Sequence, residues 1–234
     1  MPIPKPARPE YSATIPSTGK RIKYQPFSVK EEKVLILAAE SKDLDEVSNA
    51  IANVLSSSVT TPADFDVNSL ALFDIEYLFL KARAKSIGET IQLKVTDPDD
   101  GYETEHELNV DAIKVEKNKA HKDIIDIDDK IKIQMKYPGL DFFAEGLKID
   151  NINDSTETVA KCVKQIIVEE EVYSSADLSL QEILEWLDEL TSEQYKKVMT
   201  FFETMPKLRH VIKLKNPNTG NTFETVLEGL ADFF

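Results

Sequence analysis

The chain has 234 residues, of which 41% are hydrophobic and 30% are charged, a composition that allows one large globular domain or two small ones. Its net charge of −14 excludes a general nucleic-acid binder, because such binding depends on cationic side chains that neutralise phosphates. A membrane-spanning helix is also excluded, since no run approaches the roughly 18 apolar residues that a span requires. The charge is uneven: residues 1–42 hold eight basic and four acidic residues, whereas residues 141–193 hold three and fourteen.

Prolines at positions 2, 4, 6 and 9 predict an extended arm over residues 1–12, which we expect to be ordered only against a partner. This stretch also lacks the apolar run of a signal peptide. A hairpin is expected next, from Ser12 to Tyr24. Ser28 and Glu31 then form a capping box that predicts a helix to about Ala39.

The longest apolar segment, Leu70 to Ile87, has two apolar stripes at helical spacing. Such a helix is buried over most of its surface, so we expect it to be the centre of a core. Before it, Asp43 and Glu46 cap a shorter amphipathic helix that runs to about Leu55.

The middle third is predicted to be β-structure, with strands near residues 91–95, 105–110 and 131–135. Three turns share the pattern Pro-x-x-Gly between strands: Pro16–Gly19, Pro98–Gly101 and Pro217–Gly220. Proline suits the first corner of such a turn, and glycine supplies the left-handed residue that follows. We interpret them as related hairpins.

The last third returns to helix in the sequence-based prediction. Three capping pairs open helices there: Asp154 with Glu157 (apolar residues to Ile167), Ser179 with Glu182, and Thr191 with Gln194. A hairpin from Val211 to Val226 follows. The predicted fold class is α+β, with a mainly helical body around the buried central helix and several antiparallel β-hairpins.

The predicted divisions are a proline-rich arm (1–12), a helical and β-hairpin region (13–150), and a helical region ending in a β-hairpin and aromatic tail (151–234). The second and third regions are able to pack as one domain. The resemblance of the last hairpin to the middle one favours their lying together.

No catalytic, cofactor-binding or metal site is predicted. The acidic turn at residues 97–101 fails the EF-hand pattern, because Tyr102 and Leu108 stand where glycine and glutamate are needed. The histidines at 106, 121 and 210 lack ligand spacing. The single cysteine, Cys162, lies among apolar residues and is interpreted as a small core side chain. Because one cysteine allows no internal disulfide, we expect a cytosolic folding compartment.

Apolar groups at the two ends of the chain are the candidate partner-binding residues. Phe233 and Phe234 close the chain, and Pro4 and Pro6 lie in the opening arm. Phe27, after the basic hairpin strand, is added to them. An aromatic tail docks either on its own core or on a neighbouring protein.

Five segments stand out as a set: IPSTGKRIKYQPFSVKEEKVLILAAES, FDIEYLFLKARAKSIGE, EILEWLDEL, YKKVMTFFETMPKLRHVIKL and LEGLADFF. Together they resemble the baseplate hub assembly proteins of T-even-type contractile-tailed bacteriophages. The resemblance covers most of the chain and is weakest between Val110 and Gln181. It implies a hub component or an assembly chaperone, found in the virion baseplate or in the infected host cytoplasm. It implies no catalytic residues or cofactors, and other hub proteins as partners, with further copies of this chain as a second candidate.

Proteins of that family often carry Cys-x-x-Cys knuckles in the second and third hairpins, which suggests bound zinc. Here the turns are DPDDG and NPNTG, so no zinc is expected at these positions. Two alternatives stay open at this point: a small acidic hydrolase that uses carboxylates, which requires a pocket with a strongly shifted titratable group, and a host-cytoplasm adaptor.

Overall fold

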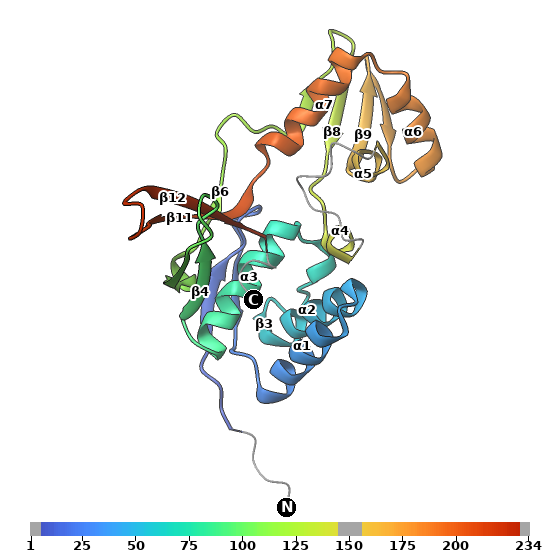
Figure 1. Cartoon of the computed structure of the whole chain (residues 1–234). Helices are drawn as coiled ribbons and strands as arrows, with labels where there is room; N and C mark the ends of the chain where they lie inside the picture. Colours follow the sequence, from blue (N-terminus) through green and yellow to red (C-terminus); the bar gives the residue numbers. More distant parts are fainter. Residues whose placement is uncertain (1–5, 145–155, 230–234) are drawn as a thin grey trace, which may run out of the picture. The chain divides into compact units, whose positions relative to one another are not determined.

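The computed structural model describes residues 6–144 and 156–229 (Figure 1). Of the described residues, 38% are in helices and 29% in strands, and these strands form four antiparallel sheets. The prediction of a mainly helical body is therefore wrong. Across the described ranges, no helix is long and apolar enough to cross a membrane.

Residues 154–167 show why the helical content was overestimated. The sequence predicts one helix there, but α5 (Thr156–Lys161) ends before a strand, β9 (Val163–Val168), and a second strand, β10 (Glu171–Ser174), follows. The run VKQIIV is rich in β-branched residues, which fit a pleated sheet better than a helix. An apolar run of this length cannot be assigned from its periodicity alone.

The chain divides into two compact units. Unit 1 comprises Met1–Glu116 and Lys207–Phe234, and unit 2 comprises Lys117–Pro206. The predicted boundary near residue 150 falls inside unit 2, whereas the last hairpin belongs to unit 1 together with the middle one. The chain leaves unit 1 after β6 (Val115–Glu116) and returns at β11 (Lys207–Lys215), where Glu116 and Lys207 are register partners.

Unit 1 contains three antiparallel sheets and three α-helices. One sheet has the order β1-β2-β3, one has β12-β11-β6, and β4 pairs with β5 alone. The elements not yet given are β1 (Tyr11–Thr14), β2 (Arg21–Tyr24), α1 (Val29–Ser41), α2 (Leu44–Ser58), β3 (Val59–Thr61), η1 (Val67–Ser69), α3 (Leu72–Ser86), β4 (Thr90–Thr96), β5 (Glu103–Asn109), η2 (Val110–Ala112) and β12 (Thr222–Glu228).

Helix α3 is the predicted central helix and is buried along most of its length. Its Leu80 and Ala84 pack in one core with residues of both long hairpins, including Val95, Leu108 and Ile212. Lys81 and Lys85 each lie 3.0 Å from a carboxylate oxygen of Asp111, which joins α3 to η2.

The three Pro-x-x-Gly turns have the same backbone geometry. In each, the glycine amide donates to the carbonyl of the residue before the proline, at 2.9, 2.9 and 2.8 Å for Gly19, Gly101 and Gly220. The three glycines have φ of +71°, +75° and +76°, values that favour glycine. The predicted turn geometry is thus confirmed in all three hairpins, and their relatedness stays an interpretation.

Side chains connect these turns to the rest of unit 1. The Asn216 amide, before the third turn, donates to Asp97 Oδ2 at 2.7 Å and to Asp100 Oδ1 at 2.9 Å in the second. In the first turn, the amide of Ser17 donates to the buried Asp74 carboxylate of α3 at 2.8 Å. Each buried carboxylate therefore accepts hydrogen bonds that offset its loss of hydration.

Unit 2 is a four-stranded antiparallel sheet with the order β10-β9-β8-β7, together with helices. Its other elements are β7 (Ile124–Asp126), β8 (Ile131–Met135), α4 (Leu140–Ala144), α6 (Leu180–Asp188) and α7 (Ser192–Thr204). Capping boxes at Ser179 and Thr191 begin α6 and α7, as the sequence predicts.

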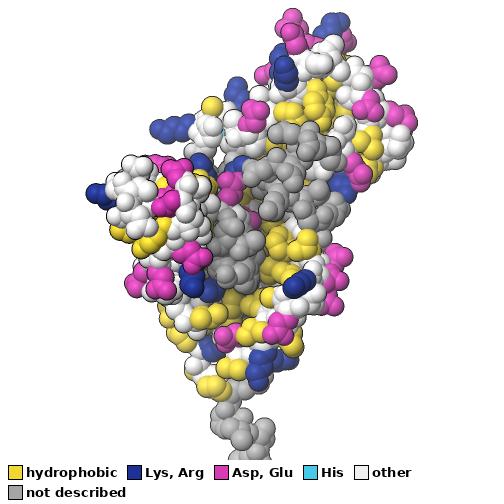
Figure 2. Space-filling model, viewed as in Figure 1, with side chains coloured by type: hydrophobic (Ala, Val, Ile, Leu, Met, Phe, Trp, Pro, Cys, Tyr) yellow, Lys and Arg dark blue, Asp and Glu magenta, His cyan; other side chains and the backbone are white. Residues whose placement is uncertain are grey.

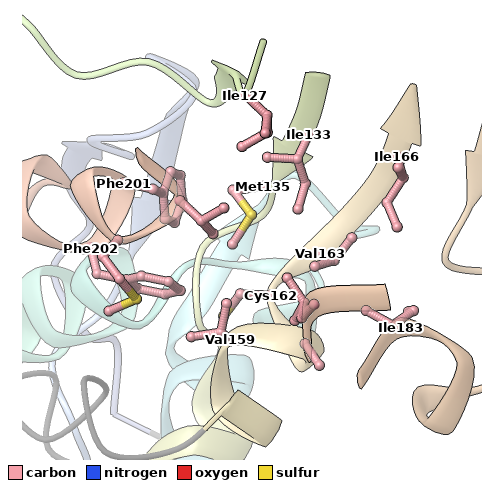
Figure 3. Close-up of a cluster of buried hydrophobic side chains, with 14 of the residues drawn as sticks. Ile127, Ile133, Met135, Val159, Cys162, Val163, Ile166, Ile183, Phe201 and Phe202 are labelled. Atoms are coloured by element: carbon pink, nitrogen blue, oxygen red, sulfur yellow. The ribbon is translucent and has the colours of Figure 1, made fainter. Parts of the chain in front are cut away.

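The core of unit 2 lies between one face of this sheet and the helices (Figure 3). Ile133 and Ile166 are register partners on β8 and β9 and are both buried. Phe201 and Phe202 of α7 pack into the same cluster, with ring centroids 5.2 Å apart in an edge-to-face arrangement. Cys162 is fully buried there, and burial raises the pKa of its thiol to about 12.

Candidate interaction surface

The structure places only part of the predicted partner-binding set. Pro4, Phe233 and Phe234 lie outside the described residues. Pro6 is exposed, and its role in partner binding stays a prediction. Phe27 is 8% exposed, and its ring centroid lies 5.5 Å from that of Phe79 in α3, so within this chain it supports the start of α1.

Hydrogen bonds attach the first turn of helix α1 to the rest of unit 1. The Phe27 amide donates to Ser86 Oγ of α3 at 2.6 Å. The capping box joins Ser28 to Glu31, as the sequence predicts. Arg8 donates both to the Pro26 carbonyl at 2.8 Å and to Glu31 at 3.0 Å, which ties the segment before β1 to the same turn.

The Glu31 carboxylate is the centre of this attachment. Burial alone would raise its pKa, but hydrogen bonds from Ser28 and Ser57 and the charge of Arg8 outweigh burial and hold the pKa below its usual value. Ser57 lies near the end of α2, so the same carboxylate joins α1 to α2. The N-terminal turn of α1 is therefore held in a defined position at neutral pH.

Helix α1 presents an apolar surface. Val29 is 68% exposed, Ile36 51% and Leu37 65%, and Val34 and Leu44 at the start of α2 are also exposed. These five are nearly half of the large hydrophobic side chains that are exposed in the described part of the chain. Single exposed hydrophobic residues are normal, whereas five on one helix and the start of the next favour an interaction surface.

The burial pattern of α1 explains this surface. Among its thirteen residues only Ala38 is buried, although VLIL occupies four consecutive positions. Four consecutive apolar residues cover more than one side of a helix, and α1 rests on unit 1 with one side only. Figure 2 shows hydrophobic side chains among charged ones in this region. The sequence analysis did not identify these residues, although VLIL was the available signal.

The His121 ring is used in packing. Both ring nitrogens of His121 are engaged, Nδ1 at 2.9 Å from Thr204 Oγ1 and Nε2 at 2.9 Å from the Tyr137 hydroxyl. Burial lowers the pKa of His121 and so favours the neutral ring. Within the ranges that the structure covers, no group of three His, Cys, Asp or Glu residues is arranged to hold a metal ion.

Comparison with known proteins gives one result. The family model described as "T4 bacteriophage base plate protein" matches residues 8–234, which is nearly the whole chain. No curated protein and no solved structure matches.

Proposed function

The chain belongs to the T4 bacteriophage base plate protein family, and on that premise we propose that it is a structural or assembly protein of the baseplate hub. As a phage baseplate protein, it belongs to the tail baseplate of the virion. We further propose that it acts through protein–protein contacts during or after hub assembly in the infected cell, in a contractile tail, with other hub proteins as partners and no catalytic step of its own.

The exposed apolar surface of α1 supports this proposal most directly. A Leu or Ile side chain gains about 1.5–3 kcal/mol on full burial, so a partner that covers Ile36 and Leu37 would gain binding free energy from both. The fixed N-terminal turn of α1 means that little conformational entropy is lost when the helix docks. Assembly proteins need such surfaces, whereas a protein acting alone gains nothing from exposing them.

Leu37→Glu tests the proposal. Leu37 is 65% exposed, so the substitution should leave the thermal unfolding temperature nearly unchanged. With a partner that buries position 37, the variant loses the apolar contact of Leu37 and must desolvate the charge of the new Glu. The affinity of the chain for that partner should therefore fall by roughly tenfold or more. The assay mixes the purified chain with the other baseplate proteins of the same phage and follows co-migration in size-exclusion chromatography.

Lys94→Glu is the control, because it changes charge at an exposed position of β4, outside α1, without removing an apolar contact. We expect wild type and Lys94→Glu to co-migrate with a hub protein and Leu37→Glu to migrate alone. The proposal fails if the wild-type chain stays alone at micromolar concentration with every baseplate protein. Unchanged co-migration of Leu37→Glu would remove α1 from the contact.

A further inference from the structure

Unit 2 carries a pocket of about 280 Å³ between β9, β10 and α6. Its lining is mostly apolar and aromatic, with one carboxylate: Ile166, Val168, Tyr173, Leu178, Glu182 and Trp186. Pockets for drug-sized molecules usually range from about 300 to 1,000 Å³, so this one has room for one or two side chains rather than a cofactor.

The chain around the pocket is strongly acidic. Residues 169–189 contain eight Asp or Glu residues and no Lys, Arg or His. In the part of the chain that the structure covers, only Glu169 of these eight pairs with a basic group, Lys130 at 2.7 Å. On the side of unit 2 that carries α6, acidic side chains lie beside hydrophobic ones (Figure 2).

Exposed apolar residues occur on the same segment. Val172 is 58% exposed, Tyr173 42% and Leu180 37%, and Tyr173 also lines the pocket. The surface thus combines a small apolar recess, an apolar margin and a surrounding negative charge.

The charge on Glu182 favours binding rather than catalysis. Hydrogen bonds from the backbone and hydroxyl of Ser179, which form the cap of α6, lower the pKa of Glu182. A general acid near neutral pH needs the opposite shift, a raised carboxyl pKa. Glu182 therefore stays ionised and adds to the negative potential at the pocket.

We propose that this pocket binds a segment of another baseplate protein in which a leucine or phenylalanine is flanked by lysines or arginines. The apolar side chain would enter between Tyr173 and Trp186, and the flanking cations would lie against the carboxylates of residues 169–189. A second copy of this chain carries a net charge of −14 and meets net repulsion, although its residues 1–42 hold eight basic and four acidic residues. The inference rests on the proposed function as a contact-forming protein and assigns a contact separate from α1.

Trp186 is the single tryptophan of the chain, so its fluorescence reports on the pocket directly. The probe is the peptide acetyl-KLKFLK-amide, titrated into the full chain at about 50 mM and about 150 mM salt, a range over which electrostatic screening increases. Acetyl-ELEFLE-amide replaces the lysines and so tests whether binding needs cations. Acetyl-KSKSSK-amide replaces the leucines and phenylalanine and so tests whether binding needs apolar side chains. We expect saturable binding of KLKFLK that weakens with salt, and at least tenfold weaker binding of the other two peptides.

A matched pair of variants locates the binding. The triple variant Asp177→Asn, Glu185→Gln, Glu189→Gln removes three exposed carboxylates beside the pocket, and should weaken KLKFLK binding at least fivefold and reduce its salt dependence. The control variant Glu103→Gln, Glu105→Gln, Glu107→Gln removes three exposed carboxylates from β5 in unit 1 and should bind as wild type.

Three results would overturn the proposal: no change in Trp186 emission with KLKFLK, equal binding of KSKSSK, or equal effects of the two triple variants. Concentration-dependent self-association in sedimentation velocity that the pocket variant abolishes would assign the surface to a second copy instead. If the peptide fails but co-migration with hub proteins still depends on Leu37, the pocket proposal falls and the proposed function stands.

Discussion

Asn216 offers the sharpest test of how unit 1 is held together. Its side-chain amide is fully buried, and the Nδ2 group donates to Asp97 and Asp100. The Oδ1 atom of the same side chain accepts from the backbone N–H of Asn218 at 2.8 Å. Hydrogen bonds to charged groups contribute roughly 1.5–3 kcal/mol each, and the two donated bonds share one amide group, so Asn216→Ala should lower the free energy of unfolding by about 3 kcal/mol. Asn216→Asp should cost more at neutral pH, because it adds a third carboxylate to the cluster.

Asn218→Ala is the control, since this side chain is exposed in the same turn, and a surface substitution of this kind changes stability by about 0.5 kcal/mol or less. Urea unfolding should be followed by far-UV circular dichroism, because the only tryptophan lies in unit 2 and does not report on this site. If Asn216→Ala and Asn218→Ala unfold at the same urea concentration, the two hairpin turns are not coupled through this amide.

Two more predictions concern unit 2. Cys162 should fail to react with a thiol reagent at pH 8 in the folded protein and should react fully in urea, because its thiol is buried and has a pKa of about 12. Rapid labelling of the folded chain would contradict the packing in Figure 3. Burial lowers the pKa of His121 from 6.5, so the unfolded state binds more protons than the folded state as the pH falls below 6.5. The free energy of unfolding should therefore be highest above pH 6.5 and should decrease as the pH falls through the pKa of His121 in the folded state. An NMR titration that gives His121 a pKa of 6.5 or higher would show this reasoning to be wrong, and His121→Asn, which removes the titrating ring, should reduce the pH dependence of the unfolding temperature.

Features that depend on neighbouring residues were predictable from the sequence. The three Pro-x-x-Gly turns and the capping boxes at Ser28, Ser179 and Thr191 form as expected, because each needs only a few adjacent residues. The central helix was also predicted closely, since its apolar periodicity extends over four turns.

Features that depend on distant pairing were not predictable. The run around Ile166 becomes a strand because β8 and β10 lie on either side of it. Its β-branched residues favour a strand, but its apolar periodicity alone does not separate a strand from a helix. Strand β11, which begins at Lys207, pairs with β6, although the two segments are far apart in the sequence. The apolar surface of α1 was not predicted for a similar reason. The sequence shows that Leu37 is apolar but not whether another part of the chain covers it.

The pairing of Glu116 with Lys207 has a consequence for the modularity of the protein. The chain exits and re-enters unit 1 at adjacent positions of one antiparallel ladder, a spacing that a two-residue β-turn can bridge. Unit 2 is therefore an insertion within a hairpin, and the pairing of the strands that flank it does not require unit 2 to be present.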